Sequence, residues 1–214
     1  MNTCYDKGIE ISYCDGNEEI SWQSIRDACV NHVFFKISEG VKCQDSLFVK
    51  HWADARNAGF ELGAWHDFTF SAGDIRTQLR NIVAALKATK FNPGLDKLAL
   101  RLNITGTEGI RSSVVLEAFH TLLEWVCLNG LHGKKPYICC STDVWEGLGG
   151  WQDYDFHDFP LWLLDQNETR LTLPIPWKVN NKMWTIRQYR QTCQIEGIEA
   201  PVALNYVYRD RPSY

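Results

Sequence analysis

The chain has 214 residues, of which 45% are hydrophobic and 22% charged, and its formal net charge is −4. This composition is typical of a folded globular protein and argues against intrinsic disorder. The basic residues are scattered along the chain, so the sequence indicates no nucleic-acid interface. No apolar run approaches the roughly 18 residues that a membrane-spanning helix needs.

The first residues do not combine a basic segment with an apolar one, so we expect no secretory signal. The sequence therefore predicts a cytoplasmic location, or export by a route that needs no such signal.

Eight cysteines are present, but there is no Cys-x-x-Cys pair and no histidine pair at zinc-finger spacing. The sequence therefore predicts neither a metal site nor a cofactor. The cysteines could form a disulfide framework or remain reduced. We favour reduced thiols, because a chain of this length can build its own core. Cys139 and Cys140 are neighbours in a predicted strand and point to opposite faces, so they are not expected to pair.

Strand-like and helix-like segments alternate along most of the chain. The predicted strands are 8–12, 33–37, 62–66, 98–103, 136–140, 159–165, 183–189 and 201–206. The predicted helices are 21–29, 45–58, 71–90, 107–129 and a short one after residue 141, and only loops separate the last three strands. Regular alternation favours a parallel sheet, and eight strands favour closure. We predict one α/β domain over 1–214, a TIM-like (β/α) barrel whose last units lack full helices.

In such barrels, reactive groups lie where the strands end, on the C-terminal face. The polar residues at predicted strand ends are Glu10, Ser38, Glu39, His66, Asp67, Arg101, Asn103, Ser141, Asp165, Gln188 and Asn205.

Seven segments together resemble a known family. They are Gly8–Ser12 (GIEIS), Phe34–Gly40 (FFKISEG), Ala55–His66 (ARNAGFELGAWH), Lys134–Pro136, Pro160–Trp162, Gln188–Tyr189 and Val202–Asn205. In this order they are similar to glycoside hydrolase family 25, the Chalaropsis-type lysozymes that cleave peptidoglycan. The resemblance runs from Gly8 to about Val207. It implies a β/α barrel with irregular last units and an N-acetylmuramidase ancestry.

The departures from the family pattern fall on the chemistry. The resemblance implies Asp-x-Glu at the end of the fourth strand, where residues i and i+2 share a face and reach the same sugar. Arg101 and Asn103 stand there instead, and neither a guanidinium nor an amide can act as a general acid. The family's last-strand aspartate corresponds to Ala203, and its first-strand aspartate to Glu10. The sequence therefore predicts that muramidase activity has been lost.

Three hypotheses remain open, ranked as follows. The first is a pseudoenzyme that binds a peptidoglycan-type glycan or a protein partner in a cell-wall or secretion setting. The second is an active muramidase with a rebuilt site, using Glu10 with Asp67 or Asp165, whose carboxyl groups would need to lie about 5–10 Å apart. The third is a structural protein whose groove is closed by Arg101.

The groove candidates share a position near predicted strand ends. They are Glu10, Trp65, His66, Asp67, Arg101, Asn103, Trp162, Asp165, Gln188, Tyr189 and Asn205.

Several of these candidates have a structural interpretation beside the functional one. We favour an ion pair between Glu10 and Arg101 over a new catalytic role for Glu10, because the arginine would otherwise be uncompensated. For Asp67 and Asp165, loop or capping roles are favoured. His66 could contact a ligand or be a satisfied buried histidine. Trp65 and Trp162 could form a sugar platform or pack inside the barrel.

Overall fold

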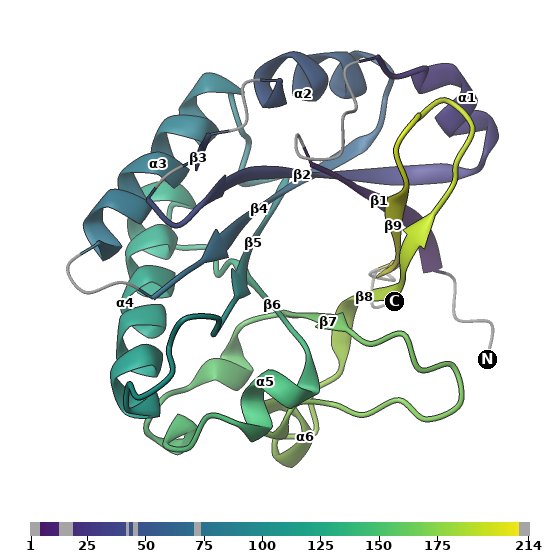
Figure 1. The fold of residues 1–214 in the computed structure, drawn as a ribbon. Coiled ribbons are helices and arrows are strands. Elements are labelled where there is room, and N and C mark those ends of the chain that lie inside the picture. Colours follow the sequence, from purple (N-terminus) through teal and green to yellow (C-terminus); the bar gives the residue numbers. More distant parts are fainter. Residues whose placement is uncertain (1–4, 13–18, 42, 45–46, 71–73, 210–214) are drawn as a thin grey trace, which may run out of the picture.

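The computed structural model describes residues 5–12, 19–41, 43–44, 47–70 and 74–209. Within this part of the chain, eight strands close into a barrel with helices around its outside (Figure 1). The barrel strands are β1 (Tyr5–Ile11), β2 (Val30–Glu39), β4 (Glu61–Phe68), β5 (Lys97–Leu102), β6 (Tyr137–Cys140), β7 (Leu161–Leu164), β8 (Trp184–Cys193) and β9 (Val202–Tyr208). The helices are α1 (Trp22–Asp27), α2 (Phe48–Asn57), α3 (Ile75–Ala88), α4 (Ser112–Gly130), α5 (Thr142–Glu146) and α6 (Ile175–Val179).

Neighbouring strands follow the order β1-β9-β8-β7-β6-β5-β4-β2, and the pairing of β1 with β2 closes the ring. Only β9 is reversed, and it runs antiparallel to both β8 and β1. A short strand, β3 (Cys43–Gln44), pairs with the end of β2. The other seven barrel strands point the same way, so their C-terminal ends meet at one end, called the upper end below. Their N-terminal ends form the lower end.

Strand alternation separates two cores. The outer core lies between the barrel wall and the helices, and α4 faces it with apolar residues at helical spacing, Val115, Phe119, Leu122 and Val126. The inner core fills the barrel and consists of Phe34, Trp65, Ala99, Cys139, Trp162, Ile186 and Val207.

Two glycines make room for the ring of Phe34 inside the barrel. A Cβ atom would lie 2.9 Å from this ring at Gly8 and 2.4 Å at Gly63, closer than van der Waals contact allows. The centre of the barrel is therefore filled by packed side chains, which separate its two ends.

The predicted barrel and all eight of its strands are confirmed, and three helix predictions need correction. The helix predicted from residue 107 begins at Ser112, because Gly106 and Gly109 adopt a φ of +80° and turn the chain. The first helix ends at Asp27 rather than residue 29, since Cys29 has a φ of +60°. A short helix, α6, lies where only loops were predicted, with Pro176 in its first turn.

The starts of the two helices predicted from residues 45 and 71 lie partly outside the described residues; α2 begins at Phe48 and α3 at Ile75. None of the described helices is long and apolar enough to cross a membrane.

The five cysteines whose side chains are described form no disulfide, and Cys139 and Cys140 do not pair with each other, as predicted. Cys4, Cys14 and the side chain of Cys43 lie outside the described part.

Candidate functional site

The upper end of the barrel carries a pocket of about 420 Å³. Its walls come from strands on both sides of the point where β1 and β2 close the ring, and from the β8–β9 connection. The residues that line it are Glu10, Ser12, Lys36, Trp65, Asp67, Arg101, Gln188, Gln191, Thr192, Pro201 and Ala203. Five of these were predicted groove candidates.

Glu10 lies at the centre of this pocket, with only 6% of its side chain exposed. Its Oε2 atom accepts a hydrogen bond from Nη2 of Arg101 at 2.5 Å. Its Oε1 atom accepts two more, from Nε2 of Gln188 at 2.7 Å and from Nδ2 of Asn205 at 3.0 Å. The predicted ion pair is thus present. Three donors converge on one buried group, which is the environment that a carboxylate anion needs.

Asn205 belongs to the support of the site rather than to its wall. It is fully buried on β9, and its Oδ1 atom accepts a hydrogen bond from Nε1 of Trp162 at 2.8 Å. This contact turns the amide so that its NH₂ group faces Glu10. A side chain of the inner core therefore fixes one of the three donors.

Arg101 crosses the mouth of the barrel from β5 to reach Glu10. Its guanidinium carbon lies 4.8 Å from the centre of the Trp65 ring, within the range of a cation–π contact, and 23% of its side chain is exposed. Although burial works against its charge, its neighbours Cys139, Glu10 and Asp67 raise the pKa of Arg101. Burial also raises the pKa of the Cys139 thiol to about 12, so this cysteine offers no thiolate nucleophile near neutral pH.

The ion pairs continue from Arg101 to the rim of β2. Nε of Arg101 lies 3.7 Å from Oδ1 of Asp67, whose Oδ2 lies 2.8 Å from Nζ of Lys36. The same ammonium contacts Oε2 of Glu39 at 2.7 Å. Burial works to lower the pKa of Lys36, but the hydrogen bonds to Asp67 and Glu39 outweigh it and raise that pKa. We call these residues, with Glu10, the upper ion-pair network.

The upper network corrects one prediction and adds one residue. Asp67 is not a loop or capping carboxylate, because it is paired inside the pocket with Lys36. Lys36 was not predicted, although a lysine within the apolar run from Phe34 to Ile37 is a signal that the sequence carries.

His66 and Tyr189 are not groove residues, because alternation in a strand turns them away from the barrel interior. His66 is fully buried behind β4, where its ring nitrogens contact Oγ of Ser38 at 2.7 Å and Oε1 of Gln78 at 2.9 Å. Burial lowers the pKa of His66 to about 4, so it is neutral at physiological pH. Tyr189 stacks on Tyr206 with 4.0 Å between ring centres.

Asn103 and Asp165 hold loops in place and do not line the pocket. Oδ1 of Asn103 accepts a hydrogen bond from the backbone N–H of Thr105 at 2.9 Å. Asp165 accepts hydrogen bonds from the backbone N–H groups of Asn167 at 2.8 Å and Thr172 at 3.3 Å. The capping role that was favoured for Asp165 is therefore confirmed, whereas its place in the groove was wrong.

Of the two alternatives left open for Trp65 and Trp162, the structure shows packing inside the barrel. Trp162 is buried with its ring centre 4.5 Å from that of Phe34, and it does not line the pocket. Trp65 lines the pocket, but it is nearly buried and Arg101 covers it.

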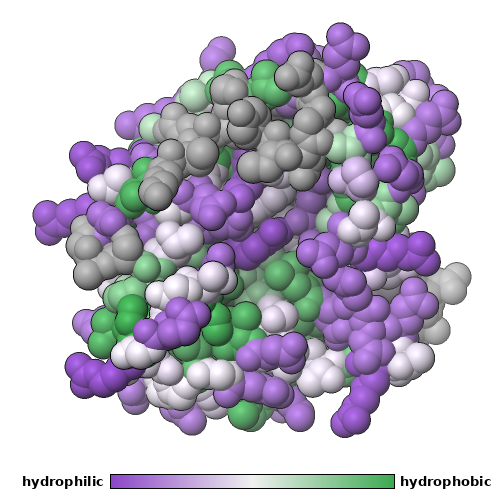
Figure 2. Space-filling model, viewed as in Figure 1, coloured by the Kyte–Doolittle hydropathy of each residue, from purple (hydrophilic) through white to green (hydrophobic). Residues whose placement is uncertain are grey.

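On the face of the molecule shown in Figure 2, hydrophobic side chains gather over the half of the barrel that contains β6 and α5.

A closed β/α barrel with a polar pocket at the C-terminal ends of its strands defines the class of protein. The family model for glycosyl hydrolases family 25 matches residues 9–198, and the chain belongs to that family.

Two relatives are similar in sequence over most of this chain. Lysozyme M1 of Streptomyces globisporus is 33% identical over 211 residues, which cover 93% of this chain and 66% of that protein. Uncharacterized protein YegX of Escherichia coli is 25% identical over 207 residues, which cover 92% of this chain and 68% of that protein. The chain thus spans about two thirds of the length of these relatives.

Solved structures agree with the fold. The bacterial lysozyme from Streptomyces coelicolor superposes with a TM-score of 0.78 at 19% identity, covering 99% of this chain and 95% of that one. The muramidase from Acremonium alcalophilum gives a TM-score of 0.75 at 21% identity, covering 96% and 94%. Both are similar to this chain in fold.

Proposed function

We propose that this family 25 barrel binds a peptidoglycan-type glycan in the upper pocket without hydrolysing it. The observation that carries the proposal is the state of Glu10. Glycoside hydrolysis needs one carboxylic acid that gives a proton to the leaving oxygen and a second carboxylate nearby. Both oxygens of Glu10 already accept hydrogen bonds, from Arg101, Gln188 and Asn205. Protein donors therefore already engage both oxygens, and Asp67, the other acid that lines the pocket, is paired with Lys36.

The open volume of the pocket supports binding over a closed groove. Arg101 reaches across the mouth, yet about 420 Å³ remains, within the range of about 300–1,000 Å³ for ligand sites. Ser12, Gln191 and Thr192 contribute hydroxyl and amide groups to the wall. Such groups match the hydroxyl and acetamido groups of an amino-sugar chain.

A rebuilt hydrolase is the second candidate, and one observation favours it. A single guanidinium, that of Arg101, contacts both Glu10 and Asp67. Their nearest oxygens are therefore no more than roughly 9 Å apart, within the spacing of about 5–10 Å seen in glycosidase pairs. Asp165 drops out, because it caps a loop outside the pocket. Against Asp67 stands its pairing with Lys36, which occupies its other oxygen.

Release of reducing ends from purified peptidoglycan separates the two candidates. We expect none from the wild type and none from Glu10→Gln. The double variant Arg101→Asp with Asn103→Glu tests whether restored acids bring back cleavage on the same scaffold. Cleavage by the wild type that is abolished in Glu10→Gln would overturn the proposal and establish the rebuilt site.

Binding is measured separately, by co-sedimentation of the protein with insoluble peptidoglycan. Two threonines of β8 form a matched pair, because Thr192 lines the upper pocket and Thr185 lies at the lower end. We expect Thr192→Ala to weaken binding and Thr185→Ala to leave it unchanged. A wild type that neither cleaves nor sediments with peptidoglycan contradicts glycan binding and points to a protein partner.

A further inference from the structure

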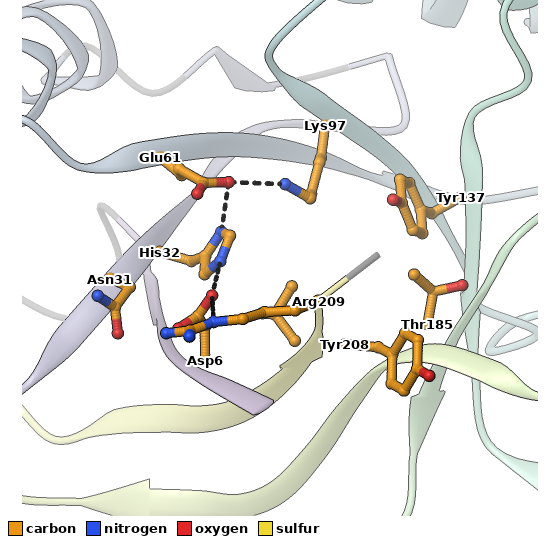
Figure 3. Close-up of a pocket in the computed structure, with 10 residues that line it drawn as sticks. Asp6, Asn31, His32, Glu61, Lys97, Tyr137, Thr185, Tyr208 and Arg209 are labelled. Atoms are coloured by element: carbon orange, nitrogen blue, oxygen red, sulfur yellow. Dashed lines mark hydrogen bonds and ion pairs between the residues drawn. The ribbon is translucent and has the colours of Figure 1, made fainter. Parts of the chain in front are cut away.

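A second pocket lies at the lower end of the barrel and is about as large as the first, with a volume of about 470 Å³ (Figure 3). Its charged residues come from the first residues of β1, β2, β4 and β5 and from the residue that follows the reversed β9. They are Asp6, His32, Glu61, Lys97 and Arg209. The proposed glycan site uses none of them.

His32 is the central group of this pocket, and only 3% of it is exposed. Its Nε2 atom lies 3.6 Å from Oδ2 of Asp6, and its Nδ1 atom lies 3.5 Å from Oε2 of Glu61. Both distances exceed those of a good hydrogen bond. Among the described residues, Nδ1 has no hydrogen-bond partner at all. A buried donor or acceptor in this state marks a place that another group can fill.

The two carboxylates beside His32 are held very differently. Asp6 is mostly buried and receives two hydrogen bonds from Arg209, one of them from Nε at 2.7 Å. Glu61 is 60% exposed, and among the described residues its other ion pair is with Nζ of Lys97 at 3.3 Å. In Figure 3 the Glu61 carboxylate reaches into the space between His32 and Lys97 from one side. Asp6 is therefore fixed, whereas Glu61 can turn out into solvent at little cost.

We propose that the lower pocket binds a small oxyanion, a phosphate or a carboxylate, which takes the place of the Glu61 carboxylate between His32 and Lys97. His32 takes up a proton from solvent as the anion enters. In the free protein the Glu61 carboxylate then acts as an internal stand-in for the ligand, and its departure leaves the positive charge of Lys97 without a partner.

The charges around His32 support this exchange. Asp6 is matched by Arg209 and Glu61 by Lys97, so the pocket is balanced while His32 is neutral. Burial lowers the pKa of His32, and the nearby Lys97 adds to this effect against the opposing influence of Glu61 and Asp6. An anion bound at Nδ1 adds a negative charge next to the ring and reverses that balance. Anion binding and proton uptake are therefore linked, and each strengthens the other.

The direct test measures binding of inorganic phosphate and of acetate to the whole protein by NMR titration, at about pH 5.5 and about pH 8, on either side of the ordinary histidine pKa. Acetate keeps one charge over this range, so its pH dependence reports on His32. We expect affinity for acetate to be at least about tenfold higher at the lower pH. Shifts should occur at residues 32, 61 and 97. The two anions also show whether phosphates or carboxylates are preferred.

Two variants sharpen the test. Glu61→Gln removes the competing carboxylate, so we expect tighter anion binding at both pH values. Lys97→Met removes the fixed cation, so binding should be lost. Lys50→Met is the matched control, because Lys50 is an exposed lysine of α2 that does not line this pocket, and binding should not change.

Three outcomes would overturn the proposal. The first is that neither anion binds the wild type or Glu61→Gln while both remain folded by circular dichroism. The second is that shifts appear at Lys36 and Arg101 instead, which places the anion in the upper pocket. The third is acetate affinity that does not depend on pH, which removes His32 from the linkage.

Discussion

Four strands, β1, β2, β4 and β5, each place a charged or titratable group in the pocket at either end of the barrel. The upper and lower groups, strand by strand, are Glu10 and Asp6, Lys36 and His32, Asp67 and Glu61, and Arg101 and Lys97. In every strand the two groups are separated by an even number of residues, so both point into the barrel. Between them lie the packed inner-core side chains and the glycines that admit them.

The contacts at the two ends differ in length and in type. At the upper end, the contacts of Glu10 and Lys36 with their partners are 2.5–3.0 Å long, and the Arg101–Asp67 pair is longer, at 3.7 Å. At the lower end, the contacts of His32 and Glu61 are 3.3–3.6 Å long and centre on a group that titrates. The comparison teaches that the upper end holds a fixed charge arrangement, whereas the lower end holds one that a proton or an anion can change.

The largest expected effect comes from breaking the upper network. Arg101→Met leaves the buried Glu10 with two amide donors and no cation, which should lower the free energy of unfolding by about 3–5 kcal/mol. Urea denaturation measures this loss. Arg190→Met is the control, because its pair with Glu168 is 4.0 Å long and exposed, and we expect a change of less than about 1 kcal/mol.

A second substitution shows whether the loss belongs to the ion pair. In the double variant Arg101→Met with Glu10→Gln no buried charge remains unpaired, so much of the stability should return. Equal losses in the single and double variants would mean that Arg101 stabilises the barrel through its packing on Trp65 instead.

The pH dependence of stability is expected to be the next largest effect, and His66 provides it. Because burial lowers its pKa from 6.5 to about 4 in the folded protein, the unfolded chain binds this proton first as the pH falls. The stability that neutral His66 contributes is complete above about pH 6.5 and is lost as the pH falls towards about 4. The loss from this residue amounts to about 3 kcal/mol.

Unfolding free energies of the wild type and His66→Gln, measured across this pH window, isolate the contribution of His66. His32 acts in the same direction, because burial also lowers its pKa, and it remains in the variant. We therefore expect a shallower pH slope in His66→Gln. Identical slopes for the two proteins would show that His66 takes up its proton in the folded state as readily as in the unfolded chain.

The barrel could be predicted from the sequence, because strand composition, strand count and β–α alternation all indicate the same fold. The ion pair of Glu10 and Arg101 could also be predicted, because both residues stand at C-terminal strand ends, which lie at the same end of a closed barrel. The misplacement of His66 and Tyr189 was avoidable. Trp65 and Gln188 immediately precede His66 and Tyr189 in their strands and face the interior. Because successive side chains of a strand point to opposite faces, His66 and Tyr189 must point away from it.

Other features depend on geometry that a strand pattern does not carry. Asn103 and Asp165 stand just beyond their strands, where a loop decides which backbone N–H groups they meet. The rule that reactive groups lie at the C-terminal ends of strands does not predict the charged residues of the lower pocket, although the even spacing from Asp6 to Glu10 is visible in the sequence. Arg209 reaches the lower end only because β9 is reversed, and composition does not reveal the direction of a strand.

The smallest expected effect comes from breaking the ion pair of Lys97 and Glu61 in the lower pocket. Lys97→Met removes the cation beside a glutamate that is 60% exposed, so the free energy of unfolding should change by no more than about 1 kcal/mol. Urea denaturation beside Arg101→Met, a change four residues further along the same strand, measures the contrast directly. A loss of unfolding free energy as large as that of Arg101→Met would show that the pair of Lys97 and Glu61 is also fixed, and that Glu61 cannot leave its place. A small loss means that any failure of Lys97→Met to bind anions reflects the missing charge rather than a damaged barrel.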